Sequence, residues 1–178
     1  MSLKRHYTMS EVQTLLYESE GRKPKPSESD SGHTVSLHGD MRGSAADGRQ
    51  TTAIILAATI EESRRMDPAE GFVVVGSDEK EVDARFTTRL DLIKAVTAAL
   101  NSSDGQIALG KIEGNGKPAA TFVAVLSPPV MNVERFTRLT GKLERGLKAT
   151  SMFVKICRIG NGKTARLHIQ TAYPKDVS

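Results

Sequence analysis

The chain has 178 residues, enough for one domain with a substantial core, and it contains no tryptophan, so Val, Ile, Leu and Ala must fill most of that core. Its formal net charge of +4 is a mild basic excess, which is compatible with a polyanionic partner. The single cysteine, Cys157, excludes an intramolecular disulfide, and the sequence has no zinc-binding Cys/His spacing, phosphate-binding glycine loop or nucleophile elbow. No apolar run is long enough to cross a bilayer, and the N-terminus lacks the apolar stretch of a signal peptide.

Residues 1–30 are predicted to form an arm or linker that precedes the folded domain. Within them, Met9 to Glu18 carry apolar residues on one side, as in a short helix. Gly21 to Ser31 are charged, interrupted by prolines and almost free of apolar side chains. We therefore expect a single domain over residues 31–178.

Two of the four histidines, His33 and His38, lie five residues apart in the segment Gly32 to Asp40. An imidazole changes its charge near neutral pH, so histidine is the usual agent of proton transfer. Solvated loop histidines without a catalytic role are the alternative that this segment by itself favours. A metal site formed by His33, His38 and Asp40 is a third reading, although His-x-x-x-x-His-x-Asp is not a familiar ligand spacing.

The middle of the chain is predicted to contain two helices with a strand between them. Arg49 to Arg65 are apolar nearly all round, which indicates a buried helix, and Gly71 to Val75 indicate a short strand. Ser77 to Asp83 read as an acidic loop. Thr88 with Asp91 then resembles the N-cap pair of a second helix, which ends at an Asn-Ser-Ser-Asp-Gly segment.

Two Gly-Asn-Gly-Lys segments, each between strand-like runs, predict two β-hairpins. The first joins Gln106–Ile112 to Ala119–Leu126, and the second joins Met152–Ile159 to Thr164–Tyr173. Between the hairpins, Val133 to Leu147 have apolar residues at helical spacing. The short connections predict an α+β domain in which N-terminal helices are followed by an antiparallel, hairpin-rich sheet.

A basic stripe accompanies the helix predicted over Val133 to Leu147. Its members are spaced so that they share one helix face, and they are Arg135, Arg138, Lys142 and Arg145. Such a stripe is usually a solvated face. It is also a candidate to bind the phosphates of a nucleic acid or to dock an acidic protein.

Alternation along the last strand separates Leu167, Ile169, Thr171 and Tyr173 on one face from Arg166, His168, Gln170 and Ala172 on the other. If the first face packs on the core, Thr171 and Tyr173 lie at its end, where a polar pair can line a cleft. The alternative is a strand whose polar end reaches water before Pro174 stops it. His168 is expected on the surface of the opposite face, and Cys157 is expected to be a buried, inert strand residue.

Several segments, taken in order, resemble the bacterial ribonuclease A-like toxin domain that is found at the C-termini of contact-dependent growth-inhibition proteins and related polymorphic toxins. The segments are Gly32-His33-Thr34, then His38 and Arg49, then Arg85-Phe86-Thr87-Thr88 before a helix, and the final Thr171-Ala172-Tyr173-Pro174. The resemblance covers most of Ser31 to Lys175 and leaves the first thirty residues outside. The resemblance rests on the order in which these segments occur in the chain.

The resemblance implies a ribonuclease A-like fold and metal-independent cleavage of RNA, in which the 2′-OH attacks phosphorus and leaves a 2′,3′-cyclic phosphate. The catalytic residues that it implies are His38, Arg49, Thr171 and Tyr173, with His33 as a second choice for the histidine. Arg42 competes with Arg49 for the phosphate-stabilising role, because the region between Arg49 and Phe86 is longer than the family's usual pattern.

The partners implied by the resemblance are an RNA substrate and a cognate immunity protein, without a membrane, a metal or a small-molecule cofactor. The toxin would act in the cytoplasm of a target cell, delivered as part of a larger protein or by a secretion system. The competing hypothesis is a non-catalytic basic module that binds nucleic acid or protein through the same stripe. It is favoured by Ser31, where the family has a second glycine, and by Gly39, where the family has an apolar residue.

Overall fold

A computed structural model of the protein describes residues 6–19, 34, 82–114, 118–137, 142–160 and 165–178. Within these residues there are three helices and one four-stranded antiparallel sheet, in agreement with the predicted α+β class. The elements in chain order are α1 (Met9–Ser19), β1 (Val82–Phe86), α4 (Arg89–Asn101), α5 (Ser103–Gly114), β2 (Ala119–Thr137), β3 (Lys142–Ile159) and β4 (Arg166–Val177).

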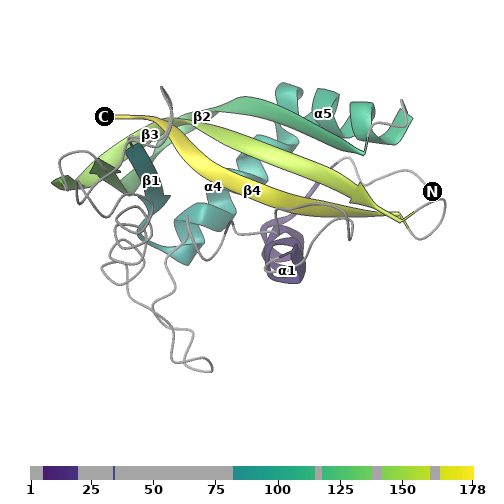
Figure 1. The fold of residues 1–178 in the computed structure, drawn as a ribbon, viewed down its shortest axis with the longest axis horizontal. Coiled ribbons are helices and arrows are strands. Elements are labelled where there is room, and N and C mark those ends of the chain that lie inside the picture. The colour runs from purple at the N-terminus through teal and green to yellow at the C-terminus, as the bar shows by residue number, and fades with distance from the viewer. Residues whose placement is uncertain (1–5, 20–33, 35–81, 115–117, 138–141, 161–164) are drawn as a thin grey trace, which may run out of the picture.

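The strands of the sheet lie in the order β1-β2-β3-β4, so β3 pairs with β2 along one side and with β4 along the other. β2 and β3 are long, at 19 and 18 residues, and β1 pairs only with the last part of β2, residues 133–137. Figure 1 shows the long strands arching side by side, with β1 and the C-terminus at the same end of the molecule.

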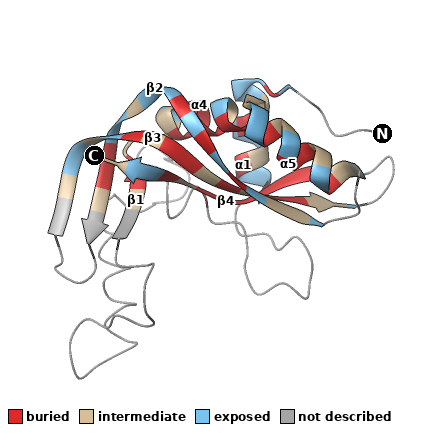
Figure 2. Cartoon of the chain, turned by 90° about the horizontal axis from the view of Figure 1, so that it is seen from above, coloured by how far each residue is buried: buried red, intermediate tan, exposed pale blue. Residues whose placement is uncertain are grey.

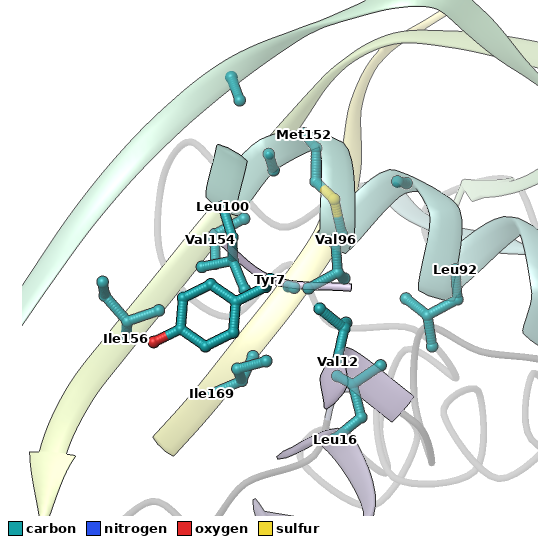
Figure 3. Close-up of a cluster of buried hydrophobic side chains, with 14 of the residues drawn as sticks. Tyr7, Val12, Leu16, Leu92, Val96, Leu100, Met152, Val154, Ile156 and Ile169 are labelled. Carbon is teal, nitrogen blue, oxygen red and sulfur yellow. The ribbon is translucent and has the colours of Figure 1, made fainter. Parts of the chain in front are cut away.

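The hydrophobic core lies between the helices and one face of the sheet (Figure 2). Along β3, alternate residues are fully buried in that core, namely Met152, Val154 and Ile156. Figure 3 shows these side chains gathered with Val96 and Leu100 of α4. Because successive side chains of a strand point to opposite faces, the alternation assigns this face of β3 to the core and leaves the other face for other uses.

Helix α1 brings the N-terminal segment into the same core. Val12 and Leu16 of this helix are buried there (Figure 3). Just before the helix, Tyr7 and Asn101 exchange two hydrogen bonds, in which the Tyr7 N–H donates to Asn101 Oδ1 at 2.9 Å and Asn101 Nδ2 donates to the Tyr7 carbonyl at 2.8 Å. A helix within the predicted arm thus contributes directly to the domain core.

The end of α1 is attached to β4 by a buried hydrogen bond. The backbone N–H of Ile169 donates to Ser19 Oγ at 3.0 Å, and Ser19 is 3% exposed. Within the described sheet β4 has a neighbour on one side only, so the bond satisfies a backbone donor that its own sheet leaves unpaired.

The predicted start of α4 is confirmed. Thr88 is the N-cap, with its Oγ1 accepting from the Asp91 N–H at 3.0 Å, and the same hydroxyl donates to Asp91 Oδ2 at 2.6 Å. The cap satisfies one of the backbone donors that every helix leaves open at its start. β1, which immediately precedes this cap, includes Val82 and Asp83, whereas the sequence predicted an acidic loop up to Asp83.

The first predicted hairpin is wrong, because Ser103–Gly114 form a helix. Ser102 begins it: its carbonyl accepts from the Gln106 N–H at 2.9 Å and its Oγ accepts from the Gly105 N–H at 3.1 Å. Ala108, Leu109 and Ile112 are then buried at helical spacing. The Asn-Gly segment after Ile112 therefore precedes β2 without joining two strands, and residues 115–117 lie outside the described residues.

The helix predicted over 133–147 is also wrong, because the described residues of this range belong to β2 and β3. Val133 pairs with Leu147 and Arg135 pairs with Glu144 across the ladder, and residues 138–141 lie outside the described residues. β2 also continues through the Ser-Pro-Pro segment that was expected to break the chain. The Ser127–Pro128 peptide is cis, and the pairing with β3 is irregular between Val125 and Val130.

The second predicted hairpin is confirmed in its strands, since β3 and β4 pair antiparallel from Ile159–Arg166 onward, and residues 161–164 between them are not described.

The helix predicted over 49–65 and the strand predicted over 71–75 lie outside the described residues. Within the described part of the chain, no helix is long and apolar enough to cross a membrane.

Gly105→Ala tests the close approach of α5 to the end of α4. A Cβ at residue 105 would meet the carbonyl oxygens of Ala99 and Leu100, which are backbone atoms and cannot move aside cheaply. In an open helix, Gly→Ala stabilises by roughly 0.5–1 kcal/mol. Here we expect urea unfolding to show a loss of about 1–3 kcal/mol. The exposed Ser103→Ala serves as the control, and a stabilised Gly105→Ala protein would contradict the contact.

Candidate functional site

The residues expected to form the site divide between the described and undescribed parts of the chain. His33, His38, Arg42 and Arg49 lie outside the described residues, as does Arg138. Thr171 and Tyr173 lie on β4. The face of the sheet that carries these two residues can therefore be built up from the strand pairing.

A bulge at Gln170 determines which residues of β4 share a face. Lys155 pairs with Thr171, whereas the next residue of β3, Ile156, pairs with Ile169, so Gln170 is an extra residue without its own partner in the ladder. An extra residue reverses the alternation that follows it. His168 consequently lies on the same face as Thr171, which corrects the opposite placement expected from simple alternation.

The face opposite the core consists of cross-strand rows. The polar row is formed by the register partners Thr121, Lys155 and Thr171. The aromatic row, two residues further along, is formed by Val123, Phe153 and Tyr173. The core-side neighbours of these residues, such as Val154 and Ala172, are fully buried, which confirms the assignment of the two faces.

The aromatic row contains a stacked pair. The rings of Phe153 and Tyr173 have centroids 4.8 Å apart and an interplanar angle of 21°. Both side chains are partly exposed, and Val123 at the β2 end of the row is 39% exposed. The stacking fixes the Tyr173 ring, since aromatic pairs at this separation stabilise one another beyond the effect of burial.

The exposure of this face varies from residue to residue. Thr121 on β2 is exposed and Lys155 is partly exposed, while His168 is 2% exposed. His168 is therefore not the surface residue that the sequence suggested. Beside it, Cys157 is buried as expected, and its Sγ donates to Gln170 Oε1 at 3.3 Å. The Thr171 hydroxyl oxygen is buried and has no hydrogen-bond partner among the described residues.

The predicted basic stripe does not form a single cationic surface, because its described members lie in paired strands. Arg135 donates from Nε to Glu144 Oε2 at 2.8 Å and from Nη1 to the Val177 carbonyl at 2.7 Å. Arg145 donates from Nε to Glu134 Oε1 at 3.1 Å. Lys142 begins β3. The charges of Arg135 and Arg145 are thus offset by carboxylates of the neighbouring strand.

Glu134 also faces a buried cation. Arg85 Nε lies 3.7 Å from Glu134 Oε2, and the two side chains are 2% and 6% exposed. The two residues are register partners of β1 and β2. A charge removed from water at this depth requires an opposite charge or hydrogen bonds to hold it, so Glu134 is placed to hold both Arg85 and Arg145.

Two residues of this face, Phe153 and Lys155, were not among the residues expected from the sequence. The signal that could have found them is the alternation of the strand Met152–Ile159, read together with its pairing to Thr171 and Tyr173. That register depends on the bulge at Gln170. Among the described residues, no group of three or more His, Cys, Asp or Glu side chains is arranged to hold a metal ion.

Comparison of the chain with models of known protein families, with curated proteins and with solved structures gave no match.

Glu134→Gln tests the buried charge pair. The change keeps the shape of the side chain but leaves Arg85 facing a neutral group at a buried position. We expect the free energy of unfolding to fall by about 3 kcal/mol in urea denaturation. The matched control is Glu144→Gln, whose carboxylate is 25% exposed and whose partner Arg135 is 31% exposed, with an expected cost below about 1 kcal/mol. Equal costs for the two variants would refute the special role of Glu134.

Proposed function

We propose that the protein is a metal-independent endoribonuclease of the ribonuclease A-like toxin type, used in competition between bacteria and neutralised by an immunity protein. The observation that carries the proposal is the bulge at Gln170. It gathers His168, Thr171 and Tyr173 on the face of β4 that points away from the hydrophobic core. A titratable imidazole, a hydroxyl and a phenol on one face suit proton transfer and phosphate or base recognition.

The proposed fold is the ribonuclease A-like arrangement. The antiparallel sheet and the helices that precede β2 are compatible with it. The resemblance in sequence ends at Thr171-Ala172-Tyr173-Pro174, and these residues lie together on β4. In this proposal β4 supplies one half of the active site, and the segment Gly32–Asp40 supplies the other.

The proposed reaction needs three chemical functions. A base removes the proton of the ribose 2′-OH, an acid protonates the leaving 5′ oxygen, and a cation stabilises the charge that develops on the phosphate. We assign the base to His38 and the cation to Arg49, whose guanidinium can donate two parallel hydrogen bonds to phosphate oxygens. Thr171 recognises a base edge or a phosphate, and Tyr173 is assigned as the acid whose hydroxyl gives its proton to the leaving 5′ oxygen or, alternatively, as a hydrogen-bond donor to the phosphate.

The competing function is a basic module that binds nucleic acid or protein without catalysis. Two members of its basic stripe, Arg135 and Arg145, are ion-paired with Glu144 and Glu134. Because those charges are already offset, the stripe offers less attraction to a polyanion than the sequence suggested. For this reason the nuclease is the proposal that we retain.

The decisive experiment is an RNA-cleavage assay in EDTA with the purified full chain. We expect cleavage that yields 2′,3′-cyclic phosphate ends, and His38→Ala should slow it by about 10²- to 10⁴-fold, the usual contribution of one acid–base group. Tyr173→Phe removes only the hydroxyl and should also slow cleavage. Tyr17→Phe on α1, at a residue that is 39% exposed, is the matched control and should cleave normally.

Two outcomes would overturn the nuclease proposal. One is a folded protein that does not cleave RNA, which favours the binding module. The other is cleavage that EDTA abolishes, which favours a metal-dependent enzyme. Circular dichroism of each variant establishes that a loss of cleavage is not a loss of folding.

A further inference from the structure

The polar row and the aromatic row lie next to each other on the same partly exposed face of the sheet. Thr121, Lys155 and Thr171 form the first, and Val123, Phe153 and Tyr173 form the second. Residues two apart on a strand are separated by about 7 Å, so a single nucleotide can reach from one row to the other. The Lys155 ammonium group thus stands beside a pair of stacked aromatic rings.

We propose that these two rows bind a single-stranded segment of RNA, with Lys155 holding a phosphate and the aromatic row supporting a base. The identification of the bound polymer as RNA rests on the proposed ribonuclease function. The inference adds Lys155 and Phe153 as substrate-binding residues of β3, and it selects single-stranded over double-helical RNA.

Lys155 is the residue that makes the surface attractive to a phosphate. Its side chain is partly exposed, it stands directly opposite Thr171, and no carboxylate among the described residues forms an ion pair with it. Arg135 and Arg145 differ from it in this respect, since each is paired with a glutamate. A partly exposed ammonium group can neutralise a phosphate and release its counterion.

The next row along the face is a weaker phosphate site. Its register partners are Val125, Ser151 and Lys175. Ser151 Oγ donates to Asp176 Oδ2 at 2.5 Å, so the carboxylate of the residue that follows Lys175 contacts this row. The negative charge of Asp176 opposes a phosphate there. The cationic side of the aromatic row is therefore the side of Lys155.

The aromatic row explains the preference for single strands. Phe153 and Tyr173 stack ring against ring, so they form an ordered stack that a base can extend from an outer ring face, and the 39% exposed Val123 continues the apolar row toward β2. A base can join such a stack only when it is not already enclosed in a double helix. Because every base has a flat π face, this stacking tolerates many sequences.

The test measures binding without cleavage. The probe is a fluorescently labelled 2′-O-methyl RNA oligonucleotide of mixed sequence, which lacks the attacking 2′-OH, either single-stranded or annealed to its complement. Fluorescence anisotropy with the full chain is recorded between about 50 and 200 mM salt. We expect tighter binding of the single strand, and Lys155→Ala should reduce the slope of log K against log salt by about 0.7, the value for one phosphate contact on a single strand.

The aromatic row has its own variant. Phe153→Ala should weaken single-strand binding by about 5- to 100-fold, the range expected for the loss of one stacked base, whereas Phe153→Tyr should restore it. Lys94→Ala removes the same charge from an exposed position on α4 and should leave affinity and slope unchanged. If Phe153→Ala does not fold, Lys155→Ala still decides the question.

The outcomes separate this inference from the ribonuclease proposal. If Lys155→Ala binds like Lys94→Ala, if the duplex binds as tightly as the single strand, or if no oligonucleotide binds, the inference is refuted even where natural RNA is cleaved. If the single strand binds in the expected Lys155-dependent way but natural RNA is not cleaved in EDTA, the nuclease proposal fails and the binding surface stands.

Discussion

The pairing of β3 with strands on both sides is the constraint on which the rest of the structure depends. β3 supplies Met152, Val154 and Ile156 to the core on one face, so α4 and α5 have an apolar surface to pack against. Its other face carries Phe153 and Lys155, and the register with β2 and β4 decides which residues stand beside them. One face of β3 thus packs in the core, and the opposite face carries the candidate site. A shift of the register by one residue would exchange these two faces.

The bulge at Gln170 also determines which residues of β4 face the core. Without the extra residue, a strand that buries Leu167 and Ile169 in the core would also turn Thr171 and Tyr173 toward it. With it, Ala172 takes the buried position and the hydroxyl residues face away from the core. One unpaired residue therefore allows the same strand to contribute apolar side chains at its start and polar chemistry at its end.

The sequence predicted those elements whose signals are local. The Thr88 cap and the antiparallel pairing of the last two strands follow from short-range patterns, and both are present. The first hairpin failed because Ser102 starts a helix with its own hydroxyl, a local signal that competes with the downstream Asn-Gly segment. Val133 to Leu147 failed for another reason: their apolar spacing fits a helix, but as strands they pair with β1 and with each other across β2 and β3. The bulge could not be predicted from β4 alone, because it depends on how β4 pairs with its neighbouring strand. The histidine half of the candidate site, around His38, lies outside the described residues.

The bond between Ser19 and the backbone of Ile169 has a consequence for the behaviour of the protein in solution. An edge strand with open N–H groups is a template on which another chain can add a strand, which is a common route to aggregation. By seating the end of α1 against β4, the protein occupies part of the side of β4 that has no neighbour within the described sheet. Removal of this segment would do more than shorten the chain, because it would expose to other molecules a strand edge that now pairs within its own molecule.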